Sequence, residues 1–420
     1  MFHGRNSRVT AALAALVLGV TLLPMASSQA ANSVTNITYF NWQFAEPGRG
    51  TALIANIDQF NATHKTIHVT PITIPYSSYA TTISTQLGAK SGPDIVNLEF
   101  DVFLRLQKAG LLADITTAIK TPAHGLATWD NNFVLNGKRF GIPWQSIGYG
   151  LIVNKSLLAK AGVAIPKTFP QFLAAAKALT QGTTQYGFAF RNTMPQESGW
   201  WVDLSNWVYG FGGSWTDSKG IPTINSPQVV RAVTEYANFY NLKLVPQGAD
   251  APTYRQMYWE GKIAMEIDNS AVPTILSTGN PAIKKDLVVV KTPFPFDRNV
   301  QTIIGTAVNA ASKNKAADAV FLNWMLLGTS QKTLITAMSA ESIATMVQPT
   351  KAMLANLPWL KSYAAIAPQG VPVMPQGQEL KTAEIRRLVL TQVDRVLRSG
   401  ITPQAAMDQA QSDVKSMLGM

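Results

Sequence analysis

The stretch with the most distinctive side-chain chemistry is "GWWVDLSNWVYGFGGSW" at residues 199–215. It holds four of the ten tryptophans of the chain, and the carboxylates of Glu197 and Asp203 lie beside or within it. Flat indole rings can cover the apolar CH faces of a sugar. Carboxylates accept hydroxyl protons in hydrogen bonds that contribute about 1.5–3 kcal/mol each. The stretch therefore predicts a binding surface for an uncharged polyol such as a sugar.

The alternative for these aromatic side chains is the hydrophobic core. For the aromatic residues of 207–211 we favour packing, because large aromatic side chains are usually buried. Trp200 and Trp201 are adjacent and would point about 100° apart on a helix, so we expect at least one of them to face a cleft. Trp144 lies in an extended segment, where a cleft and the core are equal alternatives.

Signatures of common enzyme active sites are missing. We find no HExxH, GxSxG or Walker A motif, and "YGFGGSW" lacks the glycine spacing of a dinucleotide site. His64 and His68 are four residues apart in a polar stretch without further ligands, so we expect no metal. The absence of cysteine excludes thiol chemistry, disulfides and cysteine-bound metals. We expect neither catalysis nor a cofactor.

The formal net charge of +11 is spread thinly along the chain. The densest basic pairs are at 138–139, 284–285 and 386–387, and none extends into a run. Nucleic-acid-binding proteins concentrate positive charge on one face. We therefore expect no nucleic-acid partner and attribute the charge to solubility.

The N-terminus has the pattern of a secretory signal peptide. Arg5 and Arg8 precede the apolar run "AALAALVLGVTLL", and Ser28 and Ala30 occupy the small-residue positions of a cleavage site. The run is too short to span a bilayer, which needs about 20 residues. We expect cleavage after Ala30 and a soluble periplasmic or extracellular protein. Without cysteine, it carries no lipid-modified cysteine anchor.

Apolar runs alternate with helical patterns in the first part of the chain. Strands are predicted at 36–42, 67–75 and 92–99, and helices at 51–64, 78–90 and 100–112. This alternation favours βαβ units and a parallel sheet. The sheet should carry helices on both faces, because its strands are apolar throughout.

The regular alternation of strands and helices ends at residues 137–163, an extended stretch that leads into a helix. Helices are then predicted at 169–180, 226–243, 314–328 and 377–400, and strands at 263–270 and 284–296. Ser226 as N-cap and Pro227 in the first turn mark one helix start. The length and 46% apolar content exceed what one typical core requires, which favours two domains.

In the order and spacing of several segments, residues 35–420 resemble the extracellular solute-binding proteins of carbohydrate ABC transporters, the maltose-binding-protein-like family 1. The segments are "ITYFNW", "SGPDIVNLEFDVFLRLQKAGLLADIT", "NGKRFGIPWQSIGYGLIVNKSLLAKAGV", "TFPQFLAAAKALT", "YWEGKIAMEIDNSA" and "GTAVNAASKNKAADAVFLNWML". The resemblance implies the type II periplasmic-binding-protein fold. That fold has two α/β lobes, each a mostly parallel sheet flanked by helices, and ligand is held between lobes that close about a hinge.

On this resemblance we expect five segments along the chain. They are a signal peptide at 1–30, the first lobe at 31–147 and 292–329, and the second lobe at 148–291 and 330–420. The expected partners are a small-molecule carbohydrate and the membrane permease subunits of an ABC transporter, and we expect a monomer. The protein would deliver its ligand to the permease.

Candidate ligand-binding residues follow from matching segments and from the aromatic and acidic pattern. Trp42 and Glu46 fall in the loop after the first strand, and Glu99 and Asp101 follow the "PDIV" strand, where the family commonly places an acidic sugar contact. The full set is Trp42, Glu46, Tyr76, Glu99, Asp101, Trp144, Glu197, Trp200, Trp201, Asp203, Asp268 and Asn269. Asp94 matches as well, but we expect it to serve a turn or cap.

Two departures from the family pattern leave other readings open. "DNSAV" after Asn269 lacks the aromatic residue that many relatives carry there, and "TIIGTAV" has one glycine, Gly305, where many have two. A non-sugar solute is one alternative, and the positive charge of Arg49 leaves an anionic ligand as an alternative. A secreted glycosidase is the other, with two carboxylates about 5–5.5 or 6.5–9.5 Å apart.

Overall fold

The computed structural model describes residues 33–46, 49–338 and 343–420. Contacts divide the chain into Met1–Ser33 and Val34–Met420, and all elements named below belong to the second unit. The predicted signal peptide, residues 1–30, lies outside the described residues. Among the described helices, none combines the length and apolar composition that crossing a membrane requires.

The first lobe is built on three parallel strands. β1 pairs with β2 and with β3 in parallel register, as the sequence predicts. Its elements are β1 (Thr35–Phe40), α1 (Gly50–Thr63), β2 (Ile67–Ile72), α2 (Tyr76–Gly88), β3 (Ile95–Glu99), α3 (Phe100–Lys108), the hairpin β4 (Val134–Leu135) and β5 (Lys138–Arg139), α10 (Lys315–Met325) and α11 (Gly328–Met338). Ile37, Ile95 and Val96 of the strands are fully buried, because helices cover both faces.

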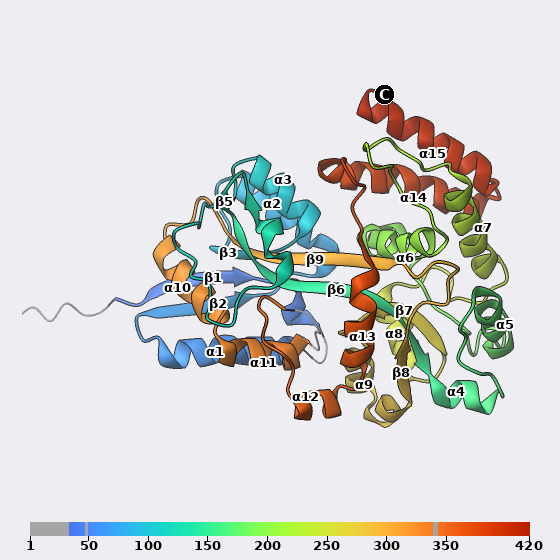
Figure 1. Ribbon diagram of the computed structural model, residues 1–420, viewed down its shortest axis with the longest axis horizontal. Coiled ribbons are helices and arrows are strands. Elements are labelled where there is room, and N and C mark those ends of the chain that lie inside the picture. Colours follow the sequence, from blue (N-terminus) through green and yellow to red (C-terminus); the bar gives the residue numbers. More distant parts are fainter. Residues whose placement is uncertain (1–32, 47–48, 339–342) are drawn as a thin grey trace, which may run out of the picture. The chain divides into compact units, whose positions relative to one another are not determined.

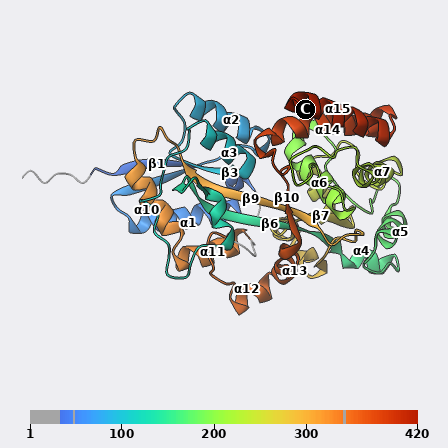
Figure 2. The ribbon, with the colours of Figure 1, turned by 45° about the horizontal axis from the view of Figure 1, so that its top comes forward.

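Two long strands run from the first lobe into the second. β6 (Gly141–Asn154) and β9 (Asn299–Val308) pair with each other. Among the described residues, three further strands complete the sheet: β7 (Met265–Asn269), β8 (Leu287–Val290) and β10 (Gly370–Pro372). The strand order is β2-β1-β3-β9-β6-β7, with β8 beside β6 and β10 beside β9. Figures 1 and 2 show β6 and β9 side by side across the middle of the molecule. This confirms the two-lobed α/β fold that the sequence predicts.

Strand direction in the second lobe is more mixed than predicted. β6 is antiparallel to β7, β8 and β9, and β9 is antiparallel to β3. The reason is connectivity, since the chain enters the second lobe along β6 and returns along β9. Among the described residues of this lobe, parallel pairing joins Gly370–Pro372 to β9 and forms isolated bridges such as Ala189 to Glu266.

The second lobe is dominated by helices. Its elements are α4 (Lys155–Lys160), α5 (Phe169–Leu179), α6 (Glu197–Gly210), α7 (Pro227–Asn241), α8 (Ala251–Trp259), β7 (Met265–Asn269), α9 (Val272–Gly279), β8 (Leu287–Val290), α12 (Lys351–Asn356), α13 (Trp359–Ile366), β10 (Gly370–Pro372), α14 (Thr382–Ser399) and α15 (Pro403–Leu418). The predicted start of α7 is confirmed, with Ser226 at the N-cap and Pro227 in the first turn.

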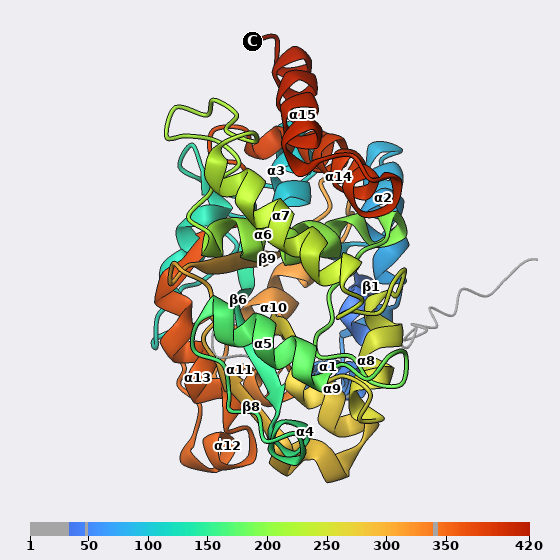
Figure 3. The same ribbon diagram turned by 90° about the vertical axis from the view of Figure 1, so that its right-hand side faces the viewer.

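Helix α6 carries the aromatic stretch through the middle of the second lobe. It packs against α7, α14 and β9, and Figure 3 shows α7 in front of it with α14 above. Every residue from Gly199 to Gly210 is buried. Trp200 and Trp201 are 0% and 1% exposed, so the expectation that at least one of these indoles is exposed to a cleft is wrong. Neighbours surround this helix, so adjacent indoles can both be buried.

Helix α11 packs against α1 of the first lobe, and Asn56 Nδ2 donates to Ser330 Oγ at 3.2 Å. Beyond it, Ile343 and Thr345 form bridges with Gln145 and Leu126. We therefore propose that the last crossing between lobes follows residue 345 rather than residue 329.

Candidate functional site

A cavity of about 400 Å³, which we call the central cavity, lies where both lobes meet the crossing strands. Ile147 and Tyr149 of β6 and Thr302 and Ile304 of β9 line it from the strands. The lobes contribute Trp42, Gln43, Glu46, Arg49, Tyr76 and Glu99 on one side, and Arg191, Gln196, Gly199, Val202, Arg255, Trp259, Asn269 and Ile275 among others on the opposite side. Such a mixture of apolar walls and few polar groups is typical of ligand sites.

The first-lobe wall is centred on Trp42. A short 3₁₀ helix, Trp42–Ala45, positions the indole, and the Asn41 side chain caps it by accepting from Gln43 N at 2.9 Å. The Trp42 ring centroid lies 5.9 Å from that of Tyr76 and 4.9 Å from that of Tyr79. In the same wall, Glu46 accepts from Arg49. Two aromatic rings and a charge-balanced pair thus face the cavity.

The second-lobe wall contains a buried network of two arginines and two aspartates. Arg191 Nη1 donates to Asp203 Oδ1 at 2.7 Å, and Arg255 Nη2 donates to Asp268 Oδ2 at 2.7 Å. Arg191 Nη2 joins the pairs through Asp268 Oδ2 at 3.3 Å. Burial alone would raise the pKa of Asp268, but Arg255 and Arg191 together lower it below its usual range. Burial raises the pKa of Asp203 to about 7 even beside Arg191, so the network is charge-balanced when both aspartates are ionised.

Gly199 allows this network to reach the cavity. A Cβ atom on Gly199 would lie 2.5 Å from Cδ of Arg191, closer than packed atoms approach. The glycine of "GWW" thus leaves room for the arginine side chain beside the first turn of α6.

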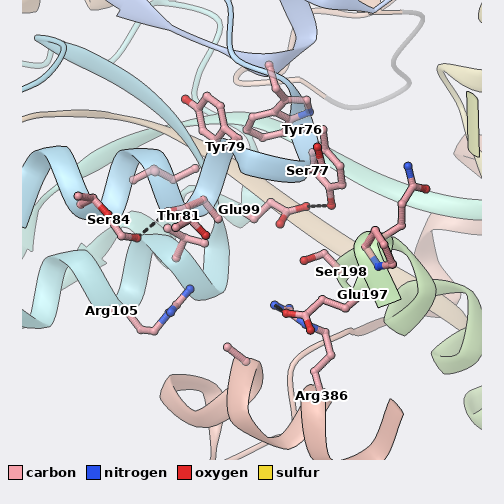
Figure 4. A pocket seen from close by; sticks show the side chains of 18 residues that line it. Tyr76, Ser77, Tyr79, Thr81, Ser84, Glu99, Arg105, Glu197, Ser198 and Arg386 are labelled. Atoms are coloured by element: carbon pink, nitrogen blue, oxygen red, sulfur yellow. Dashed lines mark hydrogen bonds and ion pairs between the residues drawn. The ribbon is translucent and has the colours of Figure 1, made fainter. Parts of the chain in front are cut away.

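A second cavity of about 330 Å³ adjoins the central one and is called the α2 cavity. The two share Trp42, Tyr76, Glu99 and Gln196. Its other lining residues are Ser77, Tyr79, Ala80, Thr81, Ser84 and Thr85 of α2, Leu98, Val102, Arg105, Pro195, Glu197, Ser198, Ala383 and Arg386. Figure 4 shows Glu197 and Arg386 opposite the side chains from α2.

Glu99 lies in the wall between the cavities. Tyr76 Oη donates to Glu99 Oε1 at 2.8 Å (Figure 4). Burial, reinforced by the nearby Asp101 carboxylate, raises the pKa of Glu99 to about 7. The side chain is therefore poised between a neutral and a charged hydrogen-bond partner near neutral pH.

The predicted ligand-binding residues fall into groups according to the cavity that they line. Those that line the central cavity, the α2 cavity or both are Trp42, Glu46, Tyr76, Glu99, Glu197 and Asn269. Asp101 and Trp201 line a small space of about 40 Å³ beside the α2 cavity. Trp144, Trp200, Asp203 and Asp268 line none of these three spaces. Asp203 and Asp268 instead form ion pairs with Arg191 and Arg255, which line the central cavity. A role in ligand binding remains a prediction for all twelve candidate residues.

The indoles outside the central and α2 cavities have structural contacts. Trp144 Nε1 donates to Gln43 Oε1 at 2.7 Å, and the ring is 3% exposed, so the core alternative holds for it. Trp201 stacks on Trp215 with centroids 4.2 Å apart, and its Nε1 donates to the Val373 carbonyl oxygen at 3.1 Å. These contacts fix α6 in the lobe.

Sequence reasoning missed the arginines Arg191, Arg255 and Arg386 and the hydroxyl side chains of α2. Arg191 lies just before the aromatic stretch, but no local pattern pairs it with aspartates 12 and 77 residues away. The signal for α2 was available, since "YSSYATTISTQLG" is a helix without any charged residue. Among the described residues, no group of three or more His, Cys, Asp or Glu side chains is placed to hold a metal.

Comparison with known proteins places this geometry in a family. Residues 45–332 match the bacterial extracellular solute-binding protein family. Diacetylchitobiose binding protein DasA of Streptomyces coelicolor is 26% identical over 255 residues, which are 58% of this chain and 59% of DasA. The putative ABC transporter periplasmic-binding protein YcjN of Escherichia coli is 23% identical over 260 residues, 59% of each protein. The match thus spans less than two thirds of these relatives.

Solved structures agree with the fold. The GacH receptor of Streptomyces glaucescens, known unliganded and in complex with acarbose, superposes with a TM-score of 0.81 at 20% identity, over 92% of this chain and 99% of GacH. The two-lobed architecture and the matched segment lead to one conclusion. The chain belongs to the bacterial extracellular solute-binding protein family.

Proposed function

We propose that this protein is the substrate-binding component of an ABC importer and that its ligand is an uncharged carbohydrate held in the central cavity. Family membership and the cavity between two lobes support the binding role. The names of two relatives support the ligand class and the transport role, since DasA is a diacetylchitobiose binding protein and YcjN a putative ABC transporter periplasmic-binding protein.

The observation that carries the ligand class is the charge balance of the central cavity. Each of its arginines contacts a carboxylate, with Glu46 on Arg49, Asp203 on Arg191 and Asp268 on Arg255. A free anion would have to compete with these carboxylates. A neutral polyol instead uses the remaining donors, such as the buried Nε of Arg255, which has no hydrogen-bond partner in the part of the chain that the structure describes, and stacks its CH faces on aromatic rings.

Transport requires that the permease distinguish loaded from empty protein. A ligand that touches both lobes binds the closed arrangement better than the open one and shifts the population toward it. Small-angle scattering should show compaction on saturation with sugar. An unchanged radius of gyration with binding confirmed by calorimetry would count against closure.

Calorimetry with a panel of mono- and oligosaccharides tests the ligand class. Trp259→Ala, at a half-buried ring that lines the central cavity, should weaken sugar binding about tenfold, or about 1.4 kcal/mol. Trp324→Ala is the matched control, because this half-buried indole packs on Phe60 and Phe321 of the first lobe. Equal affinity for both variants would contradict the site.

Two alternatives stay open to test. Three arginines in the central cavity are the observation that favours an anionic solute, and tighter binding of inorganic phosphate than of any sugar would establish it. For a glycosidase, incubation with oligosaccharides would release reducing ends. We propose that none are released, so that binding is the whole activity.

We further propose an exported monomer. Intact mass of protein recovered from the native host should begin at Ala31 if the signal peptide is cleaved after Ala30. Light scattering on the purified chain should give the monomer mass.

A further inference from the structure

We propose that the α2 cavity is a second sugar chamber, so that the ligand is an oligosaccharide whose chain lies across the Tyr76–Glu99 pair. This inference rests on the proposed function, because it extends the ligand of the central cavity. It begins from the shared wall. Trp42, Tyr76 and Glu99 from the first lobe and Gln196 from the second lobe line both cavities.

The shared wall presents surfaces suited to a sugar on either side. The Trp42 and Tyr76 rings contact each other at a 54° tilt, so they do not form one flat stack. Gln196 is held in place because its Oε1 accepts from Ala251 N at 3.0 Å. Tyr76 begins α2 and is 38% exposed, so its ring can adjust to a chain that passes over it.

The α2 face of the new chamber is a stripe of hydroxyl groups. Ser77, Thr81, Ser84 and Thr85 follow the i, i+4, i+7, i+8 spacing of one helix face, and all four line the cavity. The opposite face of α2 is apolar and buried, with Ile83 and Leu87. An exposed helix face normally carries charged residues, whereas hydroxyls alone suit a polyhydroxyl ligand.

The guanidinium groups of Arg386 and Arg105 in this chamber have donors that make no short hydrogen bond. Arg386 contacts Asp101 at 3.8 Å and Glu197 at 3.5 Å, and Arg105 contacts Asp101 at 3.8 Å. Charge-assisted hydrogen bonds are normally about 2.7–2.9 Å long. The buried Nε atoms of Arg386 and Arg105 have no partner among the described residues. Ligand oxygens can therefore replace these long contacts with short ones.

Charge and size define the class of ligand. Arg105 and Arg386 are matched in the lining by Glu99 and Glu197, so the chamber favours a neutral ligand over an anion. The volumes of about 330 and 400 Å³ each lie near the lower end of the range of about 300–1,000 Å³ for small-molecule sites. Occupation of both chambers requires two or more linked sugar rings.

The test is a length series. Glucose and N-acetylglucosamine, with their β- and α-linked oligomers of two to four residues, are titrated into the full mature chain by calorimetry. We expect oligomers to bind at least tenfold tighter than the monosaccharide. Equal affinity for one and several residues would overturn the second chamber and leave the proposed function intact. Failure of every sugar to bind would overturn the proposed function itself.

Variants in the α2 cavity test whether the tighter binding of oligomers comes from that cavity. Thr81→Phe places a ring in the α2 cavity and should weaken oligomer binding at least tenfold, with monosaccharide affinity changed less than twofold. Ser78→Phe is the matched control, because Ser78 is exposed on α2 and does not line the cavity; it should change neither.

Arg386→Met removes the guanidinium and keeps most of the aliphatic part of the side chain. It is a second, independent test in case Thr81→Phe does not fold. It should weaken oligomers about fivefold or more and leave the monosaccharide unchanged. Thermal unfolding confirms that each variant is folded. Equal weakening of short and long sugars by both variants would overturn the assignment.

Discussion

The two adjoining cavities hold their arginines in different ways. In the central cavity, Arg191 and Arg255 each make a 2.7 Å ion pair with a buried aspartate. In the α2 cavity, the contacts of Arg386 with carboxylates are 3.5–3.8 Å long. Breaking a short buried pair leaves an uncompensated charge, whereas the attraction between two charges weakens as the distance between them grows. We infer that the first group maintains the wall of the site and the second has donors left for ligand.

The largest effect should come from the aspartate shared by both arginines of the central cavity. Asp268→Ala removes the short partner of Arg255 and the second partner of Arg191, so the free energy of unfolding should fall by about 3–5 kcal/mol. Urea unfolding of ligand-free protein measures this.

Asp101→Ala is the matched control in the other cavity. Its contacts with Arg105 and Arg386 are both 3.8 Å long, and Arg386 keeps Glu197 as a second partner, so the loss of stability should be smaller than for Asp268→Ala. If the two aspartate variants lose equal stability, ion-pair length does not separate the two groups of arginines.

Two tryptophans should likewise separate an effect on stability from an effect on ligand binding. Trp200 is fully buried and lines neither cavity, so Trp200→Ala should lower the free energy of unfolding by about 3–5 kcal/mol. Sugar affinity measured well below the melting temperature should change less than twofold. Trp42→Ala, at a ring that lines both cavities, should weaken binding tenfold or more. A Trp200 variant that folds normally but fails to bind would reverse these roles.

Sequence patterns predicted the elements well because periodicity is a local property. The strand at 95–99, the helix after Ser226 and the long extended stretch that became β6 all follow from runs of neighbouring residues. The resemblance to a known family added the two lobes. What failed was the burial of α6, since a helix surrounded by α7, α14 and β9 needs no polar face.

The site was predicted only in part, and the division has a physical cause. Trp42 and Glu99 follow strands at the edge of the cleft, so chain order alone brings them to the cavity. The partners of Arg191 are Asp203 and Asp268, which lie far apart in sequence. No pattern in one sequence pairs such residues, because tertiary packing decides which carboxylate each guanidinium meets.

A buried carboxyl behind the central cavity should make the stability of the folded chain depend on pH. Glu266 is 1% exposed, and its two oxygens have no hydrogen-bond partner among the described residues. Burial, followed by repulsion from Asp268, raises its pKa to about 8. The folded state then holds a proton that the unfolded chain releases above about pH 4.5. Stability should fall between about pH 4.5 and 8, by up to about 1.4 kcal/mol per pH unit.

Glu266→Met removes the titrating group at similar size. Urea unfolding of this variant at pH 5, 6.5 and 8 should give a flatter profile than the native chain, with the largest gain at pH 8. An unchanged profile would show that other groups set the pH dependence.

The smallest effect concerns Glu99 in the wall shared by both cavities. Its folded pKa of about 7 means that the carboxyl is partly protonated at neutral pH. A carboxylate accepts a sugar hydroxyl more strongly than a neutral carboxyl does, by about 1 kcal/mol on typical values. Sugar binding should therefore favour the ionised form and release a fraction of a proton near pH 7. Affinity should rise a few-fold from pH 5.5 to 8.5.

Calorimetry in two buffers that differ in ionisation enthalpy measures that proton directly. Glu99→Gln should abolish both the proton release and the pH dependence of affinity. Tyr76→Phe removes the phenol that donates to Glu99 at 2.8 Å, and this hydrogen bond stabilises the ionised carboxylate. The Glu99 pKa should therefore rise further, and the gain in affinity should shift to higher pH. In the central cavity burial raises the pKa of Asp203 to about 7 against the opposing effect of Arg191, so Asp203→Asn measures what part of the proton release comes from that carboxyl. If proton release persists in Glu99→Gln, the titrating group lies outside the shared wall.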